Sequence, residues 1–349
     1  MAGALERWGS EASRGAGLRA RLSRLVENEF GANTQVVNLS PMEDGHAGLT
    51  FGFDVGTAAG EPIDSFVLKL APVGVTRRGN TDVYRQAPLL RGLKTAGMPV
   101  PAVPWASPDD DMLGTPFIVM ERKPGRIFLV WAPHCSFSRD PARLRELWLQ
   151  AARLLARLHN VDWQTALPDW EKPRPLRQEL ENWKALLRHA HDPQWLAAAT
   201  KLYDLLAEHL PDEAPIGVVH GDFQPGNILY VDDRAETLID WELASIGSQG
   251  LDVGWLLMMS DGQSWEQNWR PVAPVSRDDL IKAYGEAGGP ALSRINWYQG
   301  LAHFRIVAIA FLNVKLHRSG KRTDELWERF VPSIPTLLTR GIDLAARGN

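Results

Sequence analysis

In the first third of the chain, apolar and polar residues alternate over short runs, as they do in strands of a half-buried sheet. Turns that contain Gly or Pro separate three such runs: residues 34–39, 49–55 and 65–70. Before them, apolar residues recur at helical spacing from Leu18 to Phe30 and stop at Gly31. A second helix is expected over 83–94, followed by a Pro-rich extended segment and a strand pair ending in the segment TPFIVMERKPGR. The pattern predicts a small, mostly antiparallel β section with a helix laid on it.

Beyond Pro124 and Gly125, apolar residues recur every three or four positions, which is the spacing of one face of a helix. Helices are expected over 141–159, 178–187, 194–210, 251–260, 277–285, 296–318 and 324–347. A β-like island at 216–241 interrupts them. The chain is therefore expected to have an α+β fold with a β-rich lobe at 1–122 and a larger helical lobe at 123–349.

Composition excludes several classes of protein. The 349 residues include 38 Lys and Arg and 42 Asp and Glu, for a net charge of −4, and no polybasic stripe suggests a nucleic-acid or membrane partner. The single cysteine, Cys135, fits a reducing compartment. No apolar stretch approaches the ~20 residues of a membrane span, and the mixed charges of the first thirty residues do not resemble a targeting peptide. A cytoplasmic protein is expected, of an oligomeric state that the sequence does not indicate.

Candidate chemistry lies in the β-like island, in the segment VVHGDFQPGNILYV and the LIDWE that follows it. Asp222, Asn227 and Asp240 supply a carboxylate, a carboxamide and a second carboxylate. Apolar runs on both sides of Asp232-Asp233-Arg234 predict a hairpin that brings Asn227 and Asp240 together. Mg²⁺ prefers such oxygen ligands, and phosphoryl transfer needs an acid that orients the attacking hydroxyl. Gly-Asp and Asp-Trp pairs are common in turns, so the prediction depends on the complete set.

The segments HGDFQPGNIL and IDWELASIGSQGLDVGWLL resemble the aminoglycoside-phosphotransferase-like kinase family. The DWE sequence and the LDV sequence with its Trp are similar to the branch of kinase domains attached to acyl-CoA dehydrogenases. The resemblance extends from about residue 18 to residue 318. It implies a bilobal protein-kinase-like fold, Mg²⁺ as cofactor, ATP or GTP as phosphate donor, and a hydroxyl of a small molecule as acceptor.

The resemblance also implies roles for individual residues. Asp222 is expected to be the catalytic base, and Asn227 and Asp240 are expected to hold Mg²⁺. His220 is interpreted as a buried side chain that holds the catalytic turn through hydrogen bonds, in preference to a proton relay. Asp252 is interpreted as an anchor for backbone amides near the catalytic loop.

In the first lobe, the fold implied by the resemblance places a phosphate-binding lysine at Lys69. Backbone N–H groups around Gly45 and Gly48 could cover the phosphates, although a plain hairpin turn explains these glycines nearly as well. Met120 and Glu121 fall where the connection between lobes should bind adenine through its backbone.

One departure from the family pattern concerns the partner of that lysine. Kinases of this fold pair the lysine with a glutamate, but the matching position here holds Gln86, which lacks the charge of a strong partner. Pro88 follows two residues later and is tolerated only in the first turn of a helix. Either the helix starts near Arg85, or the alignment is shifted by a few residues. A nucleotide-binding pseudokinase without activity is the rival hypothesis.

Acceptor recognition is expected in the helical lobe. From residue 255 to residue 349 there are twelve Lys and Arg and nine acids, an excess that suits a neutral or anionic acceptor better than a polycation. Arg305 could contact a substrate anion or form an ion pair with a carboxylate of the lobe. Trp255 and other tryptophans could form an aromatic cage or simply pack. The acceptors considered are a hydroxyacyl-CoA, a hydroxy acid, an antibiotic and an amino alcohol.

Overall fold

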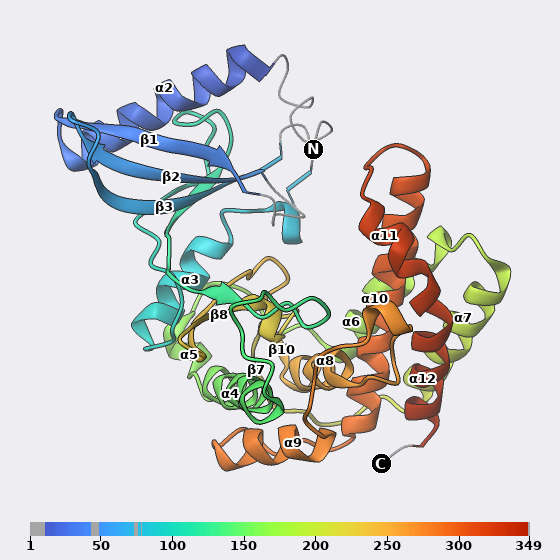
Figure 1. Ribbon diagram of the computed structural model, residues 1–349. Coiled ribbons are helices and arrows are strands. Elements are labelled where there is room, and N and C mark those ends of the chain that lie inside the picture. The colour runs from blue at the N-terminus through green and yellow to red at the C-terminus, as the bar shows by residue number, and fades with distance from the viewer. Residues whose placement is uncertain (1–10, 43–48, 73–75, 78, 348–349) are drawn as a thin grey trace. The chain divides into compact units, whose positions relative to one another are not determined.

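The computed structural model describes residues 11–42, 49–72, 76–77 and 79–347. The chain divides into two compact units, Met1–Pro124 and Gly125–Asn349, a division two residues from the boundary expected after residue 122. The fold is mixed, with an antiparallel sheet in the first unit and a larger helical second unit (Figure 1). Among the described residues, no helix combines the length and the apolar character needed to cross a membrane.

The first unit is built around a five-stranded antiparallel sheet with the order β1-β2-β3-β5-β4. Its elements are α2 (Glu11–Phe30), β1 (Thr34–Pro41), β2 (Leu49–Thr57), β3 (Pro62–Leu70), η2 (Gly79–Thr81), α3 (Gln86–Thr95), β4 (Trp105–Ser107) and β5 (Phe117–Glu121). The predicted antiparallel β section with a helix laid on it is confirmed.

Alternation along β3 decides which side chains form the core of this unit. Phe66, Leu68 and Leu70 are buried in one cluster with apolar side chains of α2 such as Leu22. Lys69 lies between two of these residues and therefore points to the other face of the sheet.

The described part of the second unit has two small sheets, one of two strands and one of three, surrounded by helices. β7 (Ile216–Val219) pairs with β10 (Ser245–Ser248), and β8 (Ile228–Val231) pairs with β6 (Arg126–Ile127) and β9 (Arg234–Leu238). The helices are α4 (Pro141–His159), α5 (Trp163–Ala166), α6 (Leu176–Lys184), η3 (Leu187–His189), α7 (Pro193–Glu208), η4 (Pro225–Asn227), α8 (Gly250–Ser260), η5 (Gln267–Trp269), α9 (Arg277–Glu286), α10 (Ile295–Arg318), α11 (Glu325–Phe330), η6 (Val331–Ser333) and α12 (Ile334–Ala346).

Local sequence explains where several of these helices begin. α4 and α7 each start with a proline in the first turn, after Asp140 and Asp192, whose side chains accept hydrogen bonds from backbone amides. α9 begins with a capping box formed by Ser276 and Asp279.

Two expectations from the sequence were wrong in detail. The single helix expected over 324–347 is divided into α11, η6 and α12, because Pro332 and Pro335 each remove a backbone donor. The β-like island at 216–241 is split between two sheets, and β10, which lies outside the island, is the partner of β7. Pairing between strands distant in sequence has no local pattern from which it could be predicted.

The long helix α10 is buried over most of its length and packs against α7, α8 and α12 (Figure 1). Its approach to α8 is unusually close at Gly254. A Cβ atom added there would lie 2.3 Å from the backbone oxygen of Tyr298. The glycine is therefore required by packing between the two helices.

We expect Gly254→Ala to lower the free energy of unfolding by about 1–3 kcal/mol or more, because backbone must shift to admit the methyl group. Gly285→Ala is the matched control in α9, since a Cβ atom there has no atom within 4 Å. Helix propensity alone should make that variant more stable by about 0.5–1 kcal/mol. Urea denaturation of both variants measures the difference; equal changes would contradict the packing argument.

A second stability prediction concerns His303 in α10, which is fully buried. Its Nε2 and the Ser264 hydroxyl are 2.7 Å apart, and its Nδ1 lies 2.7 Å from the Gln299 carbonyl oxygen. Burial lowers the pKa of His303 from 6.5 to about 4. The unfolded chain therefore binds this proton at a higher pH than the native protein does.

The stabilisation from a neutral His303 is full above pH 6.5 and is lost as the pH falls through the native value. We expect this residue to reduce the free energy of unfolding by about 3 kcal/mol between those limits. Denaturation curves at pH 7.5, 5.5 and 4.5 for the wild type and His303→Gln test this. The variant should be less stable at neutral pH but should lose less stability on acidification, and parallel pH profiles would contradict the assignment.

Candidate active site

The centre of the candidate site is the segment between β7 and β8, which contains Asp222. The Gly221 residue before it has a φ of +87°, and a Cβ atom there would lie 2.4 Å from the Leu243 carbonyl oxygen. Only glycine combines this conformation with this space. The backbone therefore turns sharply immediately before the acid.

Both sides of that turn are held by buried charged groups. The Asp252 carboxylate accepts hydrogen bonds from the amides of His220 (2.7 Å) and Gly221 (2.8 Å). The Arg305 guanidinium donates to the Gly221 carbonyl oxygen at 2.8 Å. The interpretation of Asp252 as an anchor for backbone amides is confirmed.

Asp252 is itself supported from α4 and α9. His159 Nε2 lies 3.4 Å from the Asp252 carboxylate, and His159 Nδ1 lies 2.7 Å from the Tyr284 hydroxyl. Burial alone would raise the pKa of Asp252, but the hydrogen bond and electrostatic interaction with His159, together with the hydrogen bond from the His220 amide, lower it below its ordinary value. The anchor therefore stays ionised beneath the turn.

The Asp222 carboxylate, which is half-buried, accepts three side-chain hydrogen bonds. The Trp255 indole N–H (2.7 Å) and the Gln224 amide (3.0 Å) donate to Oδ1. The Asn227 amide donates to Oδ2 at 3.1 Å and to the Asp222 backbone oxygen at 2.7 Å. These contacts fix the orientation of the acid.

The electrostatic surroundings of Asp222 favour proton uptake. Removal of water around the carboxylate and the negative charge of Asp240 raise the pKa of Asp222 above its ordinary value of 3.8. The electrostatic interaction with His220 and the hydrogen bonds from Asn227 and Gln224 oppose this effect but do not cancel it. A carboxylate whose pKa is raised in this way is a better proton acceptor than one exposed to water.

The predicted hairpin is confirmed. β8 and β9 are antiparallel, and Asp232 and Asp233 between them have φ values of +50° and +61°. The Ile239 amide donates to the Asn227 carbonyl oxygen at 2.9 Å. Asp240 is the next residue after Ile239, so this hydrogen bond brings Asp240 close to Asn227. Asp240 has a φ of +64°, an uncommon conformation for a residue other than glycine.

The side-chain oxygen atoms of Asn227 and Asp240 are of the kind that binds a hard divalent cation. The Asn227 amide nitrogen donates to Asp222, so these contacts do not use its side-chain oxygen. Within the described part of the chain, no group of three or more His, Cys, Asp and Glu side chains could hold a metal ion by itself. One carboxylate and one amide are a suitable protein contribution for Mg²⁺, which takes its other ligands from phosphate and water.

His220 is fully buried, and its Nε2 lies 2.9 Å from the Ile239 carbonyl oxygen. Its ring also lies 4.7 Å from the Trp241 ring, centroid to centroid. The interpretation of His220 as a side chain that holds the turn is confirmed. It connects the Asp222 segment to the end of the hairpin that carries Asp240.

The structure places the remaining candidates of the second unit away from solvent. Arg305 is 2% exposed, and its Nε lies 3.9 Å from a carboxylate oxygen of Glu179. Of the two alternatives for Arg305, these contacts are those of the ion pair. Trp255 is 3% exposed and uses its indole N–H on Asp222. Glu179 and Gln224 were missed, because neither stands in a local pattern that separates it from an ordinary polar residue.

In the first unit, Lys69 lies opposite Thr50 of β2 and Ile118 of β5. Met120 and Glu121 are the last two residues of β5. Gly45 and Gly48 lie outside the described residues.

Gln86 is the first residue of α3, after Arg85, and is 3% exposed. The alternative in which the helix starts near Arg85 is therefore confirmed, and Pro88 falls in the first turn of α3, where proline is tolerated.

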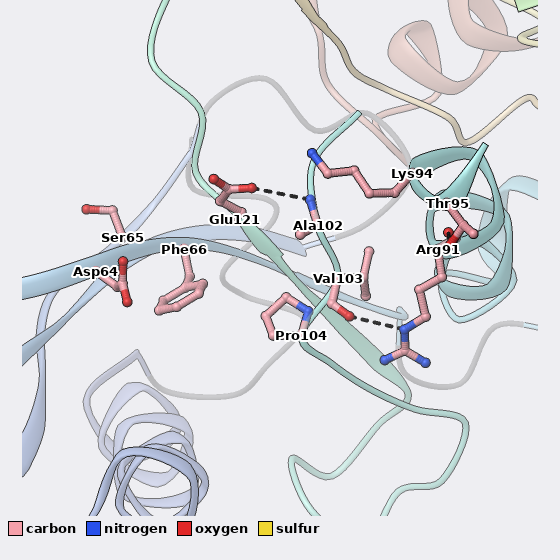
Figure 2. A pocket seen from close by; sticks show the side chains of 10 residues that line it. All are labelled: Asp64, Ser65, Phe66, Arg91, Lys94, Thr95, Ala102, Val103, Pro104 and Glu121. Atoms are coloured by element: carbon pink, nitrogen blue, oxygen red, sulfur yellow. Dashed lines mark hydrogen bonds between the residues drawn. The ribbon is translucent and has the colours of Figure 1, made fainter. Parts of the chain in front are cut away.

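Glu121 also borders a cavity of about 490 Å³ within the first unit (Figure 2). Its carboxylate accepts a long hydrogen bond of 3.5 Å from the Ala102 amide, and Arg91 donates to the Val103 carbonyl oxygen on the opposite wall. Phe66 lines this cavity and Lys69 does not. The two side chains point to opposite faces of β3, so the cavity is separate from the face that carries the lysine.

The chain belongs to the phosphotransferase enzyme family, whose sequence profile matches residues 45–298.

Curated relatives are acyl-CoA dehydrogenase family members that carry a similar region. The chain is 26% identical to acyl-CoA dehydrogenase family member 10 of Mus musculus over 260 residues, which is 70% of this chain and 24% of that protein. It is 25% identical to family member 11 of Homo sapiens over 338 residues, which is 91% of this chain and 41% of that protein. The chain thus spans well under half the length of these relatives.

Solved structures share the fold at low identity. A Ralstonia eutropha protein classed as a candidate aminoglycoside phosphotransferase has a TM-score of 0.76 and 20% identity, with 95% of this chain and 98% of that chain covered. A choline/ethanolamine kinase family protein from Mesorhizobium loti has a TM-score of 0.57 and 17% identity, covering 94% and 98%. Aminoglycoside phosphotransferase APH(2'')-Ib with ADP bound has a TM-score of 0.57 and 15% identity, covering 94% and 98%.

Proposed function

We propose that this phosphotransferase moves the γ-phosphoryl group of ATP or GTP to a hydroxyl of a small molecule, with Mg²⁺ as cofactor. The observation that carries the proposal is the orientation of the Asp222 carboxylate by N–H donors of Gln224, Asn227 and Trp255. The negative charge of Asp240 also acts on this carboxylate. The ADP bound to one structural neighbour supports a nucleotide as donor.

In this proposal Asp222 orients the acceptor hydroxyl and takes its proton. The hydroxyl oxygen forms a bond to the γ-phosphorus while the bond from that phosphorus to the β–γ bridging oxygen breaks. The raised pKa of Asp222 supports this role, because it increases the proton affinity of the carboxylate. Its hydrogen bonds hold it in one geometry, and positioning supplies much of the rate in this class of reaction.

Asn227 and Asp240 would hold the magnesium ion. When bound, Mg²⁺ neutralises negative charge on the phosphate oxygens. The Asn227 amide bridges to Asp222, so the residue proposed to bind metal also steadies the proposed base. Lys69 would bind phosphate oxygens, the backbone at Met120 and Glu121 would bind the base of the nucleotide, and amides around Gly45 and Gly48 would cover its phosphates.

For the acceptor, we propose a hydroxyacyl-CoA or a hydroxy acid. The curated relatives carry names of acyl-CoA dehydrogenases, which supports an acyl compound. The excess of basic residues after residue 254 also suits a neutral or anionic acceptor. The intact set of Asp222, Asn227 and Asp240 argues against a pseudokinase, which has no need of a positioned base.

A screen for nucleoside diphosphate release tests the proposal. The purified chain is incubated with ATP or GTP and with hydroxyacyl-CoA esters, hydroxy acids, amino alcohols or aminoglycosides, with Mg²⁺ or with excess EDTA. The expected result is Mg²⁺-dependent ADP or GDP release that an acyl acceptor stimulates. Nucleotide binding without turnover on any acceptor would instead favour the pseudokinase, and stimulation by aminoglycosides alone would overturn the acceptor assignment.

A further inference from the structure

The Asp222 carboxylate depends on a tryptophan from a distant part of the chain. Trp255 lies in α8, 33 residues after Asp222, and its indole N–H donates to Oδ1 at 2.7 Å. A buried hydrogen bond to a charged acceptor is stronger than one between neutral groups. The orientation of the Trp255 ring therefore helps to set the orientation of the Asp222 carboxylate.

Arg305 lies against that ring. The guanidinium carbon is 5.0 Å from the centroid of the Trp255 ring and 5.0 Å from that of Trp183, so the cation contacts two indoles. Contacts of this kind are attractive, and more so when water is excluded. The same guanidinium donates to the Gly221 carbonyl oxygen at 2.8 Å, immediately before Asp222 in the chain.

The charge of Arg305 is balanced by a buried carboxylate. Glu179 is 4% exposed and accepts hydrogen bonds from Arg174 (2.9 Å) and from the Trp183 indole N–H (2.6 Å). Burial alone would raise the pKa of Glu179, but the charge of Arg305 and these hydrogen bonds lower it. The cation is therefore paired with an ionised partner, although at the long distance of 3.9 Å.

Burial of the Arg305 guanidinium in this arrangement costs folding free energy. Among the protein atoms that the structure describes, Nε and Nη1 of Arg305 have no hydrogen-bond partner. Well-packed apolar residues often replace a buried ion pair without loss of stability. The presence of a buried cation here therefore points to a task other than stability.

We propose that Arg305 is a positioning residue for Asp222, acting through the Trp255 ring and through the Gly221 carbonyl group. One contact fixes the donor to the carboxylate, and the other fixes the backbone from which the carboxylate projects. The proposal rests on the proposed function in that Asp222 must be the base for its position to affect the rate.

The test uses Arg305→Met, Trp255→Phe and the double variant. Met keeps much of the volume of the side chain without charge, and Phe keeps an aromatic ring without the N–H group. We expect each single variant to lower kcat by about 10- to 100-fold, because small errors in the position of a catalytic group are costly. The KM for nucleotide should change by less than about threefold, and the loss in the double variant should be smaller than the product of the single losses.

Trp265→Phe is the matched control. Trp265 is as buried as Trp255 and donates its indole N–H to the Met258 carbonyl oxygen at 3.1 Å, away from Asp222. It should lose stability without losing kcat per folded molecule. If kcat in the Arg305 or Trp255 variants falls only as far as the folded fraction falls, the two residues are structural and the proposal is overturned.

A second readout does not require turnover. The indole N–H resonance of Trp255, assigned by its absence in Trp255→Phe, should move in Arg305→Met, and its exchange with solvent should accelerate. An unchanged resonance would overturn the positioning role. If instead the resonance moves as expected but the wild type transfers phosphate to no acceptor, the proposed function fails and the positioning of Asp222 stands.

Discussion

Asp222→Ala should lower kcat by about 10²–10⁴-fold, the range expected for the loss of a positioned acid or base. The reason lies in the geometry, because three side-chain donors converge on this carboxylate and hold it in one orientation. His220, the nearest alternative, has Nε2 in contact with the Ile239 carbonyl oxygen and is fully buried. The measurement is steady-state release of ADP or GDP with the best acceptor from the screen.

Nucleotide affinity separates this prediction from a general loss of structure. Asp222→Ala should bind Mg-nucleotide within about threefold of the wild type, because the proposed metal ligands remain. Asp212→Ala removes an exposed carboxylate ten residues earlier and should leave kcat unchanged. Turnover by Asp222→Ala at close to the wild-type rate would show that another group accepts the proton.

Asp240→Ala should abolish the dependence of nucleotide binding on Mg²⁺. The wild type is expected to bind Mg-nucleotide more tightly than free nucleotide, because Asp240 and Asn227 complete the coordination of the cation. Loss of the carboxylate should weaken Mg-nucleotide binding by about 10- to 100-fold, since even residues that only support a ligand cost that much when removed. Isothermal titration calorimetry with Mg²⁺ and with EDTA measures both affinities.

The substitution should affect nucleotide affinity differently with Mg²⁺ and with EDTA. Free nucleotide should bind Asp240→Ala as well as or better than the wild type, because a negative charge has been removed. Glu236→Ala, on the exposed face of the same hairpin, should leave both affinities unchanged. An Asp240 variant that keeps the wild-type Mg²⁺ dependence would refute the metal assignment.

Buried charged side chains hold the backbone of the candidate site at Gly221. The Gly221 residue has its N–H bound by Asp252 and its carbonyl oxygen bound by Arg305, so both ends of this residue are held by buried charges. Preorganisation of this kind lowers the cost of reaching the reactive geometry. It comes from α8 and α10, which are rigidly packed together through Gly254.

Much of the candidate site could be predicted from neighbouring residues. The hairpin that brings Asn227 close to Asp240 follows from two apolar runs around Asp232 and Asp233, which adopt the positive φ values such a turn needs. The start of α3 at Gln86 follows from the restriction that Pro88 places on a helix. Each of these features depends on interactions over a few residues.

Other features required the folded chain. The sequence shows Arg305 as a cation within an apolar helix. That pattern does not decide whether Arg305 contacts a substrate anion or forms an ion pair with a carboxylate of the protein. The answer depends on Glu179, which lies 126 residues away and carries no motif, and on Gly221, which lies 84 residues away. The pairing of β7 with β10 was missed for the same reason.

The amino-acid sequence by itself therefore determined the class of protein, most of the strands and helices, and the choice of Asp222, Asn227 and Asp240 as candidate site residues. Only the tertiary structure decided that Trp255 turns inward to donate to Asp222, and that Arg305 turns inward to contact the Trp255 ring and the Gly221 carbonyl oxygen. Hydrogen bonds and periodic burial act between neighbours along a strand or helix, so they leave a pattern in the sequence. Contacts between side chains from α6, α8 and α10 arise only when the helices pack, and packing selects partners by shape and charge in three dimensions.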